Sequence, residues 1–174
     1  MNKPFLTGLK GLFLTSLITT QTMAKAPGSV PAANKAVVQA SFDHWAAGTG
    51  SPFDLLEPTA SWTIVGSSPL SRTYDSRQQF MDEVIKPFNA RMKARLIPTV
   101  RGVYADGDTV VIFFDTNATA KDGQPYHNTY TWYFQMRQLR VANVISFFDT
   151  REFDEFWNRV QPQSPTLTHP LCCP

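Results

Sequence analysis

Cysteine is nearly absent from this sequence, which argues against a fold held together by disulfide bonds. The chain contains two cysteines, Cys172 and Cys173, and they are neighbours close to its C-terminal end. A bond between adjacent cysteines closes a strained ring and joins no distant parts of a chain. We expect both to lie in a dispensable tail, with pairing to another chain as the alternative.

Histidine and charged residues are scarce as well. The three histidines, His44, His127 and His169, lie far apart and show no ligand spacing to acidic residues, so we expect no metal ion. Charged residues make up 17% of the chain, and the net charge of +2 forms no basic stripe. Nucleic acid is therefore not an expected partner, and no cofactor is expected either.

No hydrophobic run is long enough for a permanent membrane anchor. The apolar stretch at residues 11–20 follows Lys3 and Lys10 and precedes small residues at Thr22 and Ala24. A basic start, followed by a short apolar run and then by small residues, is typical of a secretory signal peptide. We predict a signal peptide at 1–24 and an exported protein, periplasmic or secreted. A short amphipathic surface helix is the alternative.

Aromatic residues are abundant, at 13% of the chain, and hydrophobic residues reach 43%. The roughly 150 residues after the signal peptide suit one domain with a real core. We predict a flexible leader at 25–33, the folded domain at 34–160 and a flexible C-terminal tail at 161–174.

Helices are predicted before most of the sheet, at residues 35–47, 52–56 and 76–86. In the first, Val38, Phe42 and Trp45 recur at helical spacing. Ser51 and Ser76 are the predicted caps of the other two.

Alternating apolar residues and turn sequences then predict an antiparallel meander. The predicted strands span 60–65, 96–104, 109–118 and the two arms of 126–150, and a last helix spans 151–160. Helices followed by a meander describe an α+β domain. We expect a cone in which a strongly curved antiparallel sheet wraps the N-terminal helices.

One face of the arm that begins at Tyr126 carries Asn128, Tyr130 and Trp132. Large rings with polar tips beside an amide are typical of a ligand-binding wall. Ordinary core packing against the helices is the alternative, although a buried amide without a partner costs about 1 to 3 kcal/mol.

The second arm has apolar residues on both parities. We place Phe147 and Asp149 on the side of the pocket, which leaves a sheet covered on both faces: helices inside, and a second copy of the chain outside. Asp149 with Glu152 forms a capping box for the last helix. Capping is the favoured role of Asp149, and catalysis is the alternative.

Two residues near the first strand complete the predicted site. Thr63 is assigned to the pocket and its neighbour Trp62 to the core. Tyr74 follows the turn at 66–69 and either reaches the rim of the pocket or packs the loop.

The motifs VGSSPL at 65–70, DGQPYHNTYTWYF at 122–134 and FDT at 148–150 resemble the SnoaL-like, ketosteroid-isomerase-related branch of the nuclear transport factor 2-like superfamily. The resemblance implies a cone-shaped α+β fold, a common dimeric state and one pocket for a small, mostly apolar molecule. One departure is visible, because residues 137–140 lack the Asp-Gly that is usual in that hairpin.

The resemblance also implies where catalytic residues should stand. The catalytic tyrosine of steroid isomerases corresponds to Ser41, and the acid that serves as base corresponds to Thr63. The second acid corresponds to Trp132, or to Thr131 if the alignment of that strand shifts by one residue. None of these can supply the required acid or base. An epoxide-hydrolase acid would fall on Ser146, while a SnoaL-type cyclase needs only one acid. The catalytic residues stay unknown.

Two functions follow from these observations. The first is a binding protein for a small apolar or aromatic molecule. The second is an isomerase, cyclase or lyase with a non-standard set of residues. A purely structural dimer module is a third possibility.

Overall fold

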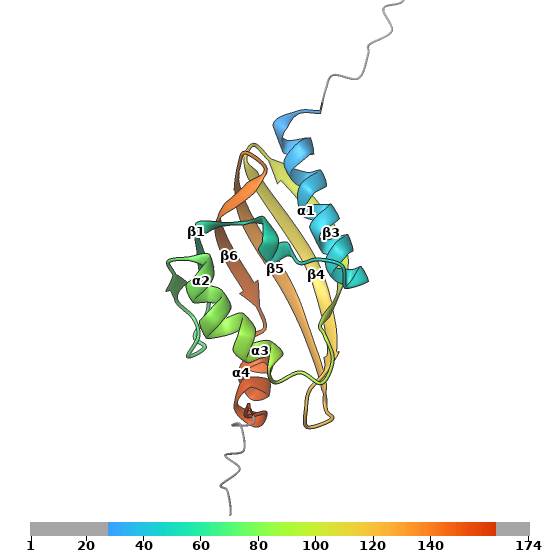
Figure 1. Ribbon diagram of the computed structural model, residues 1–174, viewed down its shortest axis with the longest axis vertical. Helices are drawn as coiled ribbons and strands as arrows, with labels where there is room; N and C mark the ends of the chain where they lie inside the picture. Colours follow the sequence, from blue (N-terminus) through green and yellow to red (C-terminus); the bar gives the residue numbers. More distant parts are fainter. Residues whose placement is uncertain (1–27, 163–174) are drawn as a thin grey trace, which may run out of the picture.

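The computed structural model describes residues 28–162 of the protein (Figure 1). Helices pack against one face of a six-stranded sheet that does not close on itself. This arrangement confirms the predicted α+β cone. The predicted signal peptide and nearly all of the predicted tail lie outside the described residues.

The sheet contains the predicted meander. Its strands are β1 (Leu56–Ile64), β2 (Thr73–Tyr74), β3 (Ile97–Asp106), β4 (Thr109–Thr119), β5 (Pro125–Arg137) and β6 (Arg140–Phe148). Their order across the sheet is β2-β1-β6-β5-β4-β3. Strands β3 to β6 are antiparallel neighbours, as expected, and β1 joins β6 in parallel.

The helical segments are α1 (Val30–Ala47), the 3₁₀ turn η1 (Pro52–Leu55), α2 (Arg77–Phe80), η2 (Met81–Ile85), α3 (Lys86–Asn89) and α4 (Thr150–Arg159). Ser51 and Ser76 accept hydrogen bonds from backbone amides at the starts of η1 and α2, so both predicted caps are confirmed. Helix α1 begins at Val30, with Pro31 in its first turn. Residues 30–33, expected to belong to the leader, are therefore helical.

The α2, η2 and α3 segments form one continuous helical stretch with a π-helical middle. Pro87 lies just after the π turn. Proline has no amide proton and its ring clashes with the carbonyl four residues earlier in a regular α-helix. The wider turn at Met81–Ile85 removes that conflict and keeps Val84 and Phe88 on the buried side.

The strand β6 contains a bulge that reverses its inner and outer faces. Gln135 pairs with Asn143 and Met136 pairs with Val141, so Ala142 is an extra residue without a partner. Beyond it, Val144 and Ser146 point into the core, whereas Ile145 and Phe147 are 40% and 44% exposed on the outer face.

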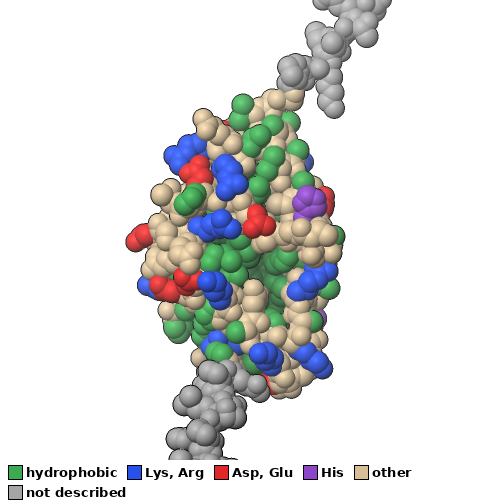
Figure 2. All heavy atoms as spheres, in the orientation of Figure 1, with side chains coloured by type: hydrophobic (Ala, Val, Ile, Leu, Met, Phe, Trp, Pro, Cys, Tyr) green, Lys and Arg blue, Asp and Glu red, His purple; other side chains and the backbone are tan. Residues whose placement is uncertain are grey.

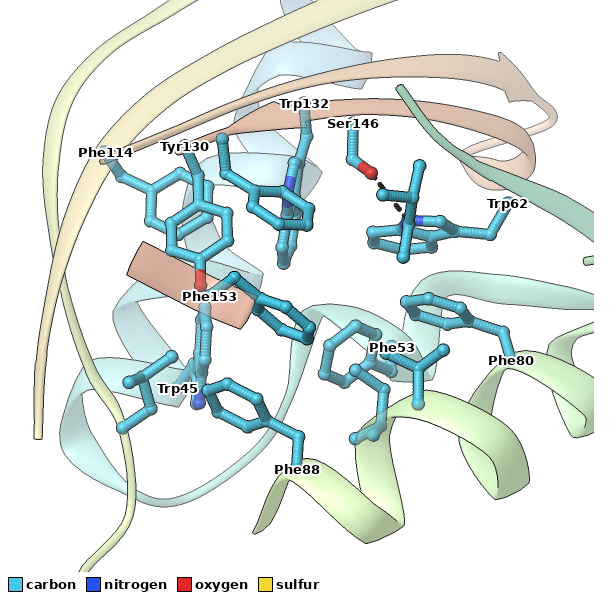
Figure 3. Close-up of a pocket in the computed structure, with 15 residues that line it drawn as sticks. Trp45, Phe53, Trp62, Phe80, Phe88, Phe114, Tyr130, Trp132, Ser146 and Phe153 are labelled. Atoms are coloured by element: carbon cyan, nitrogen blue, oxygen red, sulfur yellow. Dashed lines mark hydrogen bonds between the residues drawn. The ribbon is translucent and has the colours of Figure 1, made fainter. Parts of the chain in front are cut away.

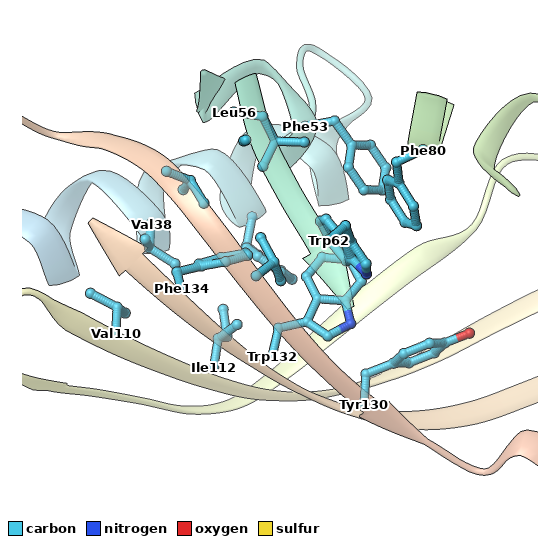
Figure 4. Packing of buried hydrophobic residues seen from close by; sticks show 14 of the residues in the cluster. Val38, Phe53, Leu56, Trp62, Phe80, Val110, Ile112, Tyr130, Trp132 and Phe134 are labelled. Atoms are coloured by element: carbon cyan, nitrogen blue, oxygen red, sulfur yellow. The ribbon is translucent and has the colours of Figure 1, made fainter. Parts of the chain in front are cut away.

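Aromatic side chains fill the concave side of the sheet (Figure 4). Trp132 of β5 lies at the centre, with Phe114 of β4 and Trp62 of β1 against it at ring distances of 4.8 and 4.9 Å. Trp62 also stacks on Phe80 at 4.1 Å, which fixes α2 against β1. A second cluster around Phe88, Phe153 and Phe156 closes the end of the cone where α3 meets α4.

Candidate ligand cavity

An apolar cavity of about 60 Å³ lies between the concave face of the sheet and the helices (Figure 3). Its wall is formed by Trp45, Phe53, Trp62, Ile64, Phe80, Val84, Ile85, Phe88, Leu96, Phe114, Tyr130, Trp132, Ser146, Phe148 and Phe153. None of these lining residues carries a charge. The cavity therefore favours apolar surface and offers little to an ion.

Both layers of the fold contribute to the wall. Tyr130 and Trp132 are two residues apart in β5, so both rings point inward from the same face of the strand. Helical periodicity places Phe80, Val84 and Phe88 on the opposite side. Side chains from strands and helices thus meet across the cavity and hold its shape by mutual packing.

Most polar atoms of the wall already have partners within the protein. Trp62 Nε1 donates to Ser146 Oγ at 2.9 Å, and Ser146 Oγ donates to the carbonyl of Thr63 at 3.0 Å. Tyr130 shares a 2.7 Å hydrogen bond with the hydroxyl of Tyr126. Trp132 Nε1 differs, because this buried donor has no partner among the described residues.

The tyrosine pair belongs to a buried chain that runs to the start of α4. Asn128 Nδ2 donates to Tyr126 Oη at 3.1 Å and to the carbonyl of Asp149 at 2.9 Å. Asn128 Oδ1 accepts from the Asp149 amide at 3.0 Å. Burial raises the pKa of both Tyr126 and Tyr130 above the ordinary value, so both hydroxyls stay protonated at neutral pH.

A second, polar hollow of about 420 Å³ is open to solvent. Its lining residues are Asp115, Thr116, Asn117, His127, Asn128, Thr129, Asp149 and Glu152.

Among residues 28–162, no group of three or more histidine, cysteine, aspartate or glutamate side chains is arranged to hold a metal ion. No helix in that part of the chain is long and apolar enough to cross a membrane.

Comparison with known proteins is informative at the level of structure. No protein-family model matches the chain, and no curated protein matches it in sequence. Several solved structures match with TM-scores between 0.52 and 0.61. An NTF2-like protein from Burkholderia pseudomallei shares 16% identity at a TM-score of 0.59, and the match covers 71% of this chain and 96% of that one.

The chain has the nuclear transport factor 2-like fold.

Two other solved structures share this fold. A protein assigned as a SnoaL-like polyketide cyclase, from Jannaschia sp. CCS1, is 15% identical at a TM-score of 0.60, covering 82% of this chain and 100% of that one. TerC, co-crystallized with polyporic acid, is 19% identical at a TM-score of 0.57, covering 72% and 98%. At these identities the likeness establishes the fold alone.

Within the nuclear transport factor 2-like fold of this chain, the predicted site residues divide into two groups. Tyr130 and Trp132 line the cavity. Asn128 is buried on the same face of β5 but does not line the cavity. Its side-chain amide forms hydrogen bonds with the Tyr126 hydroxyl and with the backbone of Asp149. Tyr74 is fully buried in the core, where its hydroxyl donates to the carbonyl of Leu70.

The placement of Phe147 and Asp149 toward the cavity is wrong. Phe147 is exposed on the outer face, because the bulge at Ala142 reverses the parity of β6. Phe148 takes the inward position instead. Asp149 caps α4 by accepting from the amides of Arg151 and Glu152, which is the role that the capping-box pattern favoured.

The assignments of Thr63 and Trp62 to pocket and core are also corrected. The Thr63 hydroxyl bonds to Thr73 on the outer side of the sheet, whereas Trp62 lines the cavity. Ala60, Trp62 and Ile64 are all buried, so strict alternation along β1 predicts this placement. The resemblance to steroid isomerases, which aligned Thr63 with their catalytic base, had favoured the opposite placement.

Sequence reasoning missed the helical half of the wall. Phe80, Val84 and Phe88 were part of, or next to, a predicted helix, and their spacing of four residues marks one buried face. Phe153 of α4 belongs to the same wall. Helical periodicity could have found the first three, but contact between α4 and the cavity depends on tertiary packing.

The face toward which the cavity opens is visible in Figure 2. Hydrophobic side chains form the floor of a hollow between α1 and the α2–α3 stretch, and charged side chains of both signs, with lysine and arginine more frequent, stand around it. This hollow is the natural approach for an apolar ligand.

Proposed function

We propose that this protein binds a small, mostly apolar or aromatic molecule in the cavity between the sheet and the helices. The observation that carries the proposal is the wall itself: a cavity lined by ten aromatic residues and no charged one. Burial of a ligand's apolar surface there stabilises the complex by roughly 25 cal/mol per Å². TerC, which has the same fold and was co-crystallized with polyporic acid, lends support.

The size of the cavity limits the ligand. A volume of about 60 Å³ is far below the ~300–1,000 Å³ of pockets that enclose drug-sized molecules. Because a cavity that holds benzene measures about 150 Å³, the expected ligand is a single ring, and even that ligand requires α2–α3 or α4 to move away from the sheet. The π turn in η2 lies directly on the wall, at a position where such turns often accompany function.

A cyclase or isomerase is the second candidate, supported by the fold shared with a protein assigned as a SnoaL-like polyketide cyclase. Such reactions need an acid or base within hydrogen-bond reach of the reacting atoms. The lining residues include no carboxylate, histidine or lysine. Binding without conversion is therefore the better-supported function.

Binding is tested by thermal shift with single-ring probes, beginning with ethylbenzene and acetophenone. A ligand at ten times its Kd adds about 1.4 kcal/mol of stability, or roughly 4 °C for a domain of this size. Mass analysis of each stabilising probe after incubation separates binding, with the probe unchanged, from catalysis. The absence of any shift across apolar and aromatic compounds would contradict the proposal.

A pair of matched variants ties the signal to the cavity. Val84→Phe adds a ring to the cavity wall, and Val111→Phe makes the same change on the outer face of β4. We expect Val84→Phe to abolish the shift and Val111→Phe to preserve it.

We also propose that the protein is exported, with residues 1–24 removed. The support is the order of basic, apolar and small residues in that segment. Expression of the full chain in a bacterium, followed by N-terminal sequencing of the periplasmic or secreted product, should give Lys25 as the first residue. A product that keeps Met1 in the cytoplasm would refute export.

Finally, we propose a homodimer through the outer face of the sheet. An apolar row crosses that face: Tyr104 pairs with Val111, Val111 with Tyr133, and Tyr133 with Ile145. Phe147 extends it with an edge-on contact to Tyr133 at 5.8 Å. Because the outer faces of two copies are identical, a two-fold axis can bring these rows together.

A further inference from the structure

The cavity reaches the surface in the hollow between α1 and the α2–α3 stretch. Most lining residues are buried, but Trp45 near the end of α1, Ile85 at the end of η2 and Phe148 at the end of β6 are half-buried. The first two come from the elements that border the hollow (Figure 2). A ligand that enters between them keeps its outermost atoms close to solvent, so the groups around this mouth decide which end group is accepted.

Arg95 is fixed at the mouth by the end of α1. Its Nη1 donates to the carbonyl of Trp45 at 2.7 Å, and its Nη2 donates to the carbonyl of Ala46 at 2.8 Å. Gly48, which ends α1 with a φ of 76°, leaves space for the guanidinium, because a Cβ there would lie 3.1 Å from Arg95 Cζ. The next residue, Leu96, lines the cavity. Arg95 is therefore joined to two lining residues, to Trp45 by a hydrogen bond and to Leu96 by the chain.

The end of α1 uses only part of what the Arg95 side chain offers. A guanidinium has five N–H donors, and two of those of Arg95 have partners among residues 28–162. The C-terminal end of a helix carries about half a negative charge, which offsets only about half of the positive charge. No carboxylate in that part of the chain forms an ion pair with Arg95, which is exposed. Positive charge and unused donors remain at the mouth.

Lys86 provides a comparison on the other side of the mouth. It directly follows Ile85, and its Nζ donates to Asp82 one turn earlier at 2.5 Å. The charge of Lys86 is thus already paired within its own helical stretch. Of these two described cations, Arg95 is the one without an acidic partner.

Resting on the proposed binding function, we propose that the ligand carries a carboxylate on its apolar ring or chain, and that Arg95 binds this carboxylate at the mouth of the cavity. The planar N–H fork of arginine matches the two oxygens of a carboxylate. The apolar part of the ligand enters the cavity, while the carboxylate stays in the open hollow and escapes the cost of burying a charge. Arylalkanoic acids belong to this class.

The test compares 3-phenylpropanoate with 3-phenylpropanamide, which have the same ring and nearly the same shape but differ in charge. In calorimetric titrations at low salt we expect an about fivefold lower Kd for the acid, which equals about 1 kcal/mol and is the upper range for an exposed ion pair. The preference should disappear at high salt, because the screening length falls from ~30 Å at ~0.01 M to ~3 Å at ~1 M ionic strength.

Three variants assign the preference to Arg95. Arg95→Gln should remove it, and Arg95→Lys should keep part of it because the positive charge stays. Arg140→Gln is the matched control, since Arg140 Nη2 also donates to a backbone carbonyl, that of Leu56 at 2.9 Å, and neither residue lines the cavity. It should leave the preference unchanged. A role of Arg95 confined to holding α1 would change the affinities of both probes by the same factor.

A direct readout keeps the test available even if Arg95→Gln fails to fold. In the ¹⁵N-labelled original protein, the Nε–H signal of Arg95 is assigned by its absence from the spectrum of Arg95→Lys. This signal should shift when the acid is added and stay in place when the amide is added.

The outcomes separate the two proposals. If neither probe binds, and ethylbenzene and acetophenone also fail to bind, the binding function is refuted and the role of Arg95 with it. If the neutral probes bind while the acid binds no better than the amide, the selection of a carboxylate is refuted and the binding function stands. If the preference for the acid survives Arg95→Gln, or the Arg95 signal ignores the acid, another group reads the carboxylate and the role of Arg95 is refuted.

Discussion

Tyr126, Asn128 and Tyr130 join the first half of β5 to the start of α4 through a continuous series of buried hydrogen bonds. Asn128 provides both a donor and an acceptor to the backbone of Asp149, which fixes the last strand of the sheet relative to the helix that follows. Its second amide proton goes to Tyr126, and Tyr126 pairs with Tyr130. Each polar atom in this series depends on its neighbour.

Tyr126→Phe tests that dependence. The variant removes one hydroxyl, so Tyr130 loses its partner and Asn128 keeps one donor contact rather than two. We expect a loss of about 1 to 2 kcal/mol in the free energy of unfolding, measured by urea denaturation at pH 8. Tyr133→Phe, which removes a partly exposed hydroxyl from the same strand, should cost much less.

The buried hydroxyls of Tyr126 and Tyr130 should make the free energy of unfolding fall at alkaline pH. Burial raises the pKa of Tyr126 and of Tyr130, so the folded state holds these protons more tightly than the unfolded chain, whose tyrosines titrate near pH 10. The stabilisation is complete below about pH 10 and is lost as the pH rises further, by at most about 1.4 kcal/mol per pH unit for each group. Unfolding free energies between pH 9 and 11 should fall less steeply in Tyr126→Phe than in the original protein, and an equal slope would contradict this account.

At the scale of elements, alternation and capping predicted the sheet and its helices well, and the exceptions have local causes. The inner face of β5 was read correctly because no irregularity interrupts its alternation between Tyr126 and Met136. In β6 the same rule failed beyond Ala142, since a single inserted residue reverses every later side chain. Nothing in the sequence around Ala142 marks a bulge, whereas Asp149 was readable as a cap because a helix N-terminus has a local chemical signature.

The β5–β6 turn is a site where the sequence is not optimal for its backbone. Gln138 and Leu139 have φ values of 49° and 63°, the left-handed region that two-residue hairpin turns require. Asn-Gly adopts this conformation more easily than Gln-Leu, and Leu139 is 46% exposed, so little packing is lost. Replacing both residues with Asn-Gly should raise the free energy of unfolding by about 1 kcal/mol.

Gly107 in the β3–β4 turn provides the opposite case. It has a φ of 53° and open space around its Cα, so Gly107→Ala should cost about 1 kcal/mol through backbone strain alone. Both effects are measured by chemical denaturation. Stabilisation by both changes, or by neither, would show that backbone conformation does not control these turns.

The N-terminus of α4 allows capping to be separated from catalysis. Asp149→Ala removes the acceptor for two backbone amides and should destabilise the fold by about 1 kcal/mol, while Asp149→Asn should cost less because asparagine is also a good cap. Ligand binding should be unchanged in both variants, since Asp149 does not line the cavity. Loss of ligand binding in a folded Asp149→Asn protein would show that the Asp149 side chain takes part in binding.

At the scale of the whole molecule, the closed end of the cone explains why half of the cavity could not be predicted. Residues far apart in sequence meet there: Phe88 of α3 stacks on Phe153 of α4 at 5.8 Å, and Phe153 contacts Phe148 at the end of β6 at 5.2 Å. Local patterns predict each element, but which elements meet is decided by the shape of the curved sheet. The resemblance to a known fold supplied that shape in outline and misplaced Thr63 in detail.

The outer face of the sheet carries the contacts of the proposed homodimer. Phe147 and Ile145 are 44% and 40% exposed in the single chain, and the paired Tyr133 is 41% exposed. Contiguous apolar surface of this kind is costly in water and typical of an interface. If two copies meet there, sedimentation velocity at micromolar concentration should show a dimer of the mature chain.

Phe147→Asp should convert that dimer to a folded monomer, because burying a carboxylate from each copy near the two-fold axis is strongly unfavourable. Tyr126 and the cavity lie on the opposite face of the sheet, so the variant's far-ultraviolet circular dichroism and its binding of acetophenone should match those of the original protein. Gln78→Asp, an equal change of charge at an exposed position of α2, should leave the dimer intact. A protein that is monomeric at all concentrations before any substitution would show that the outer face has another role.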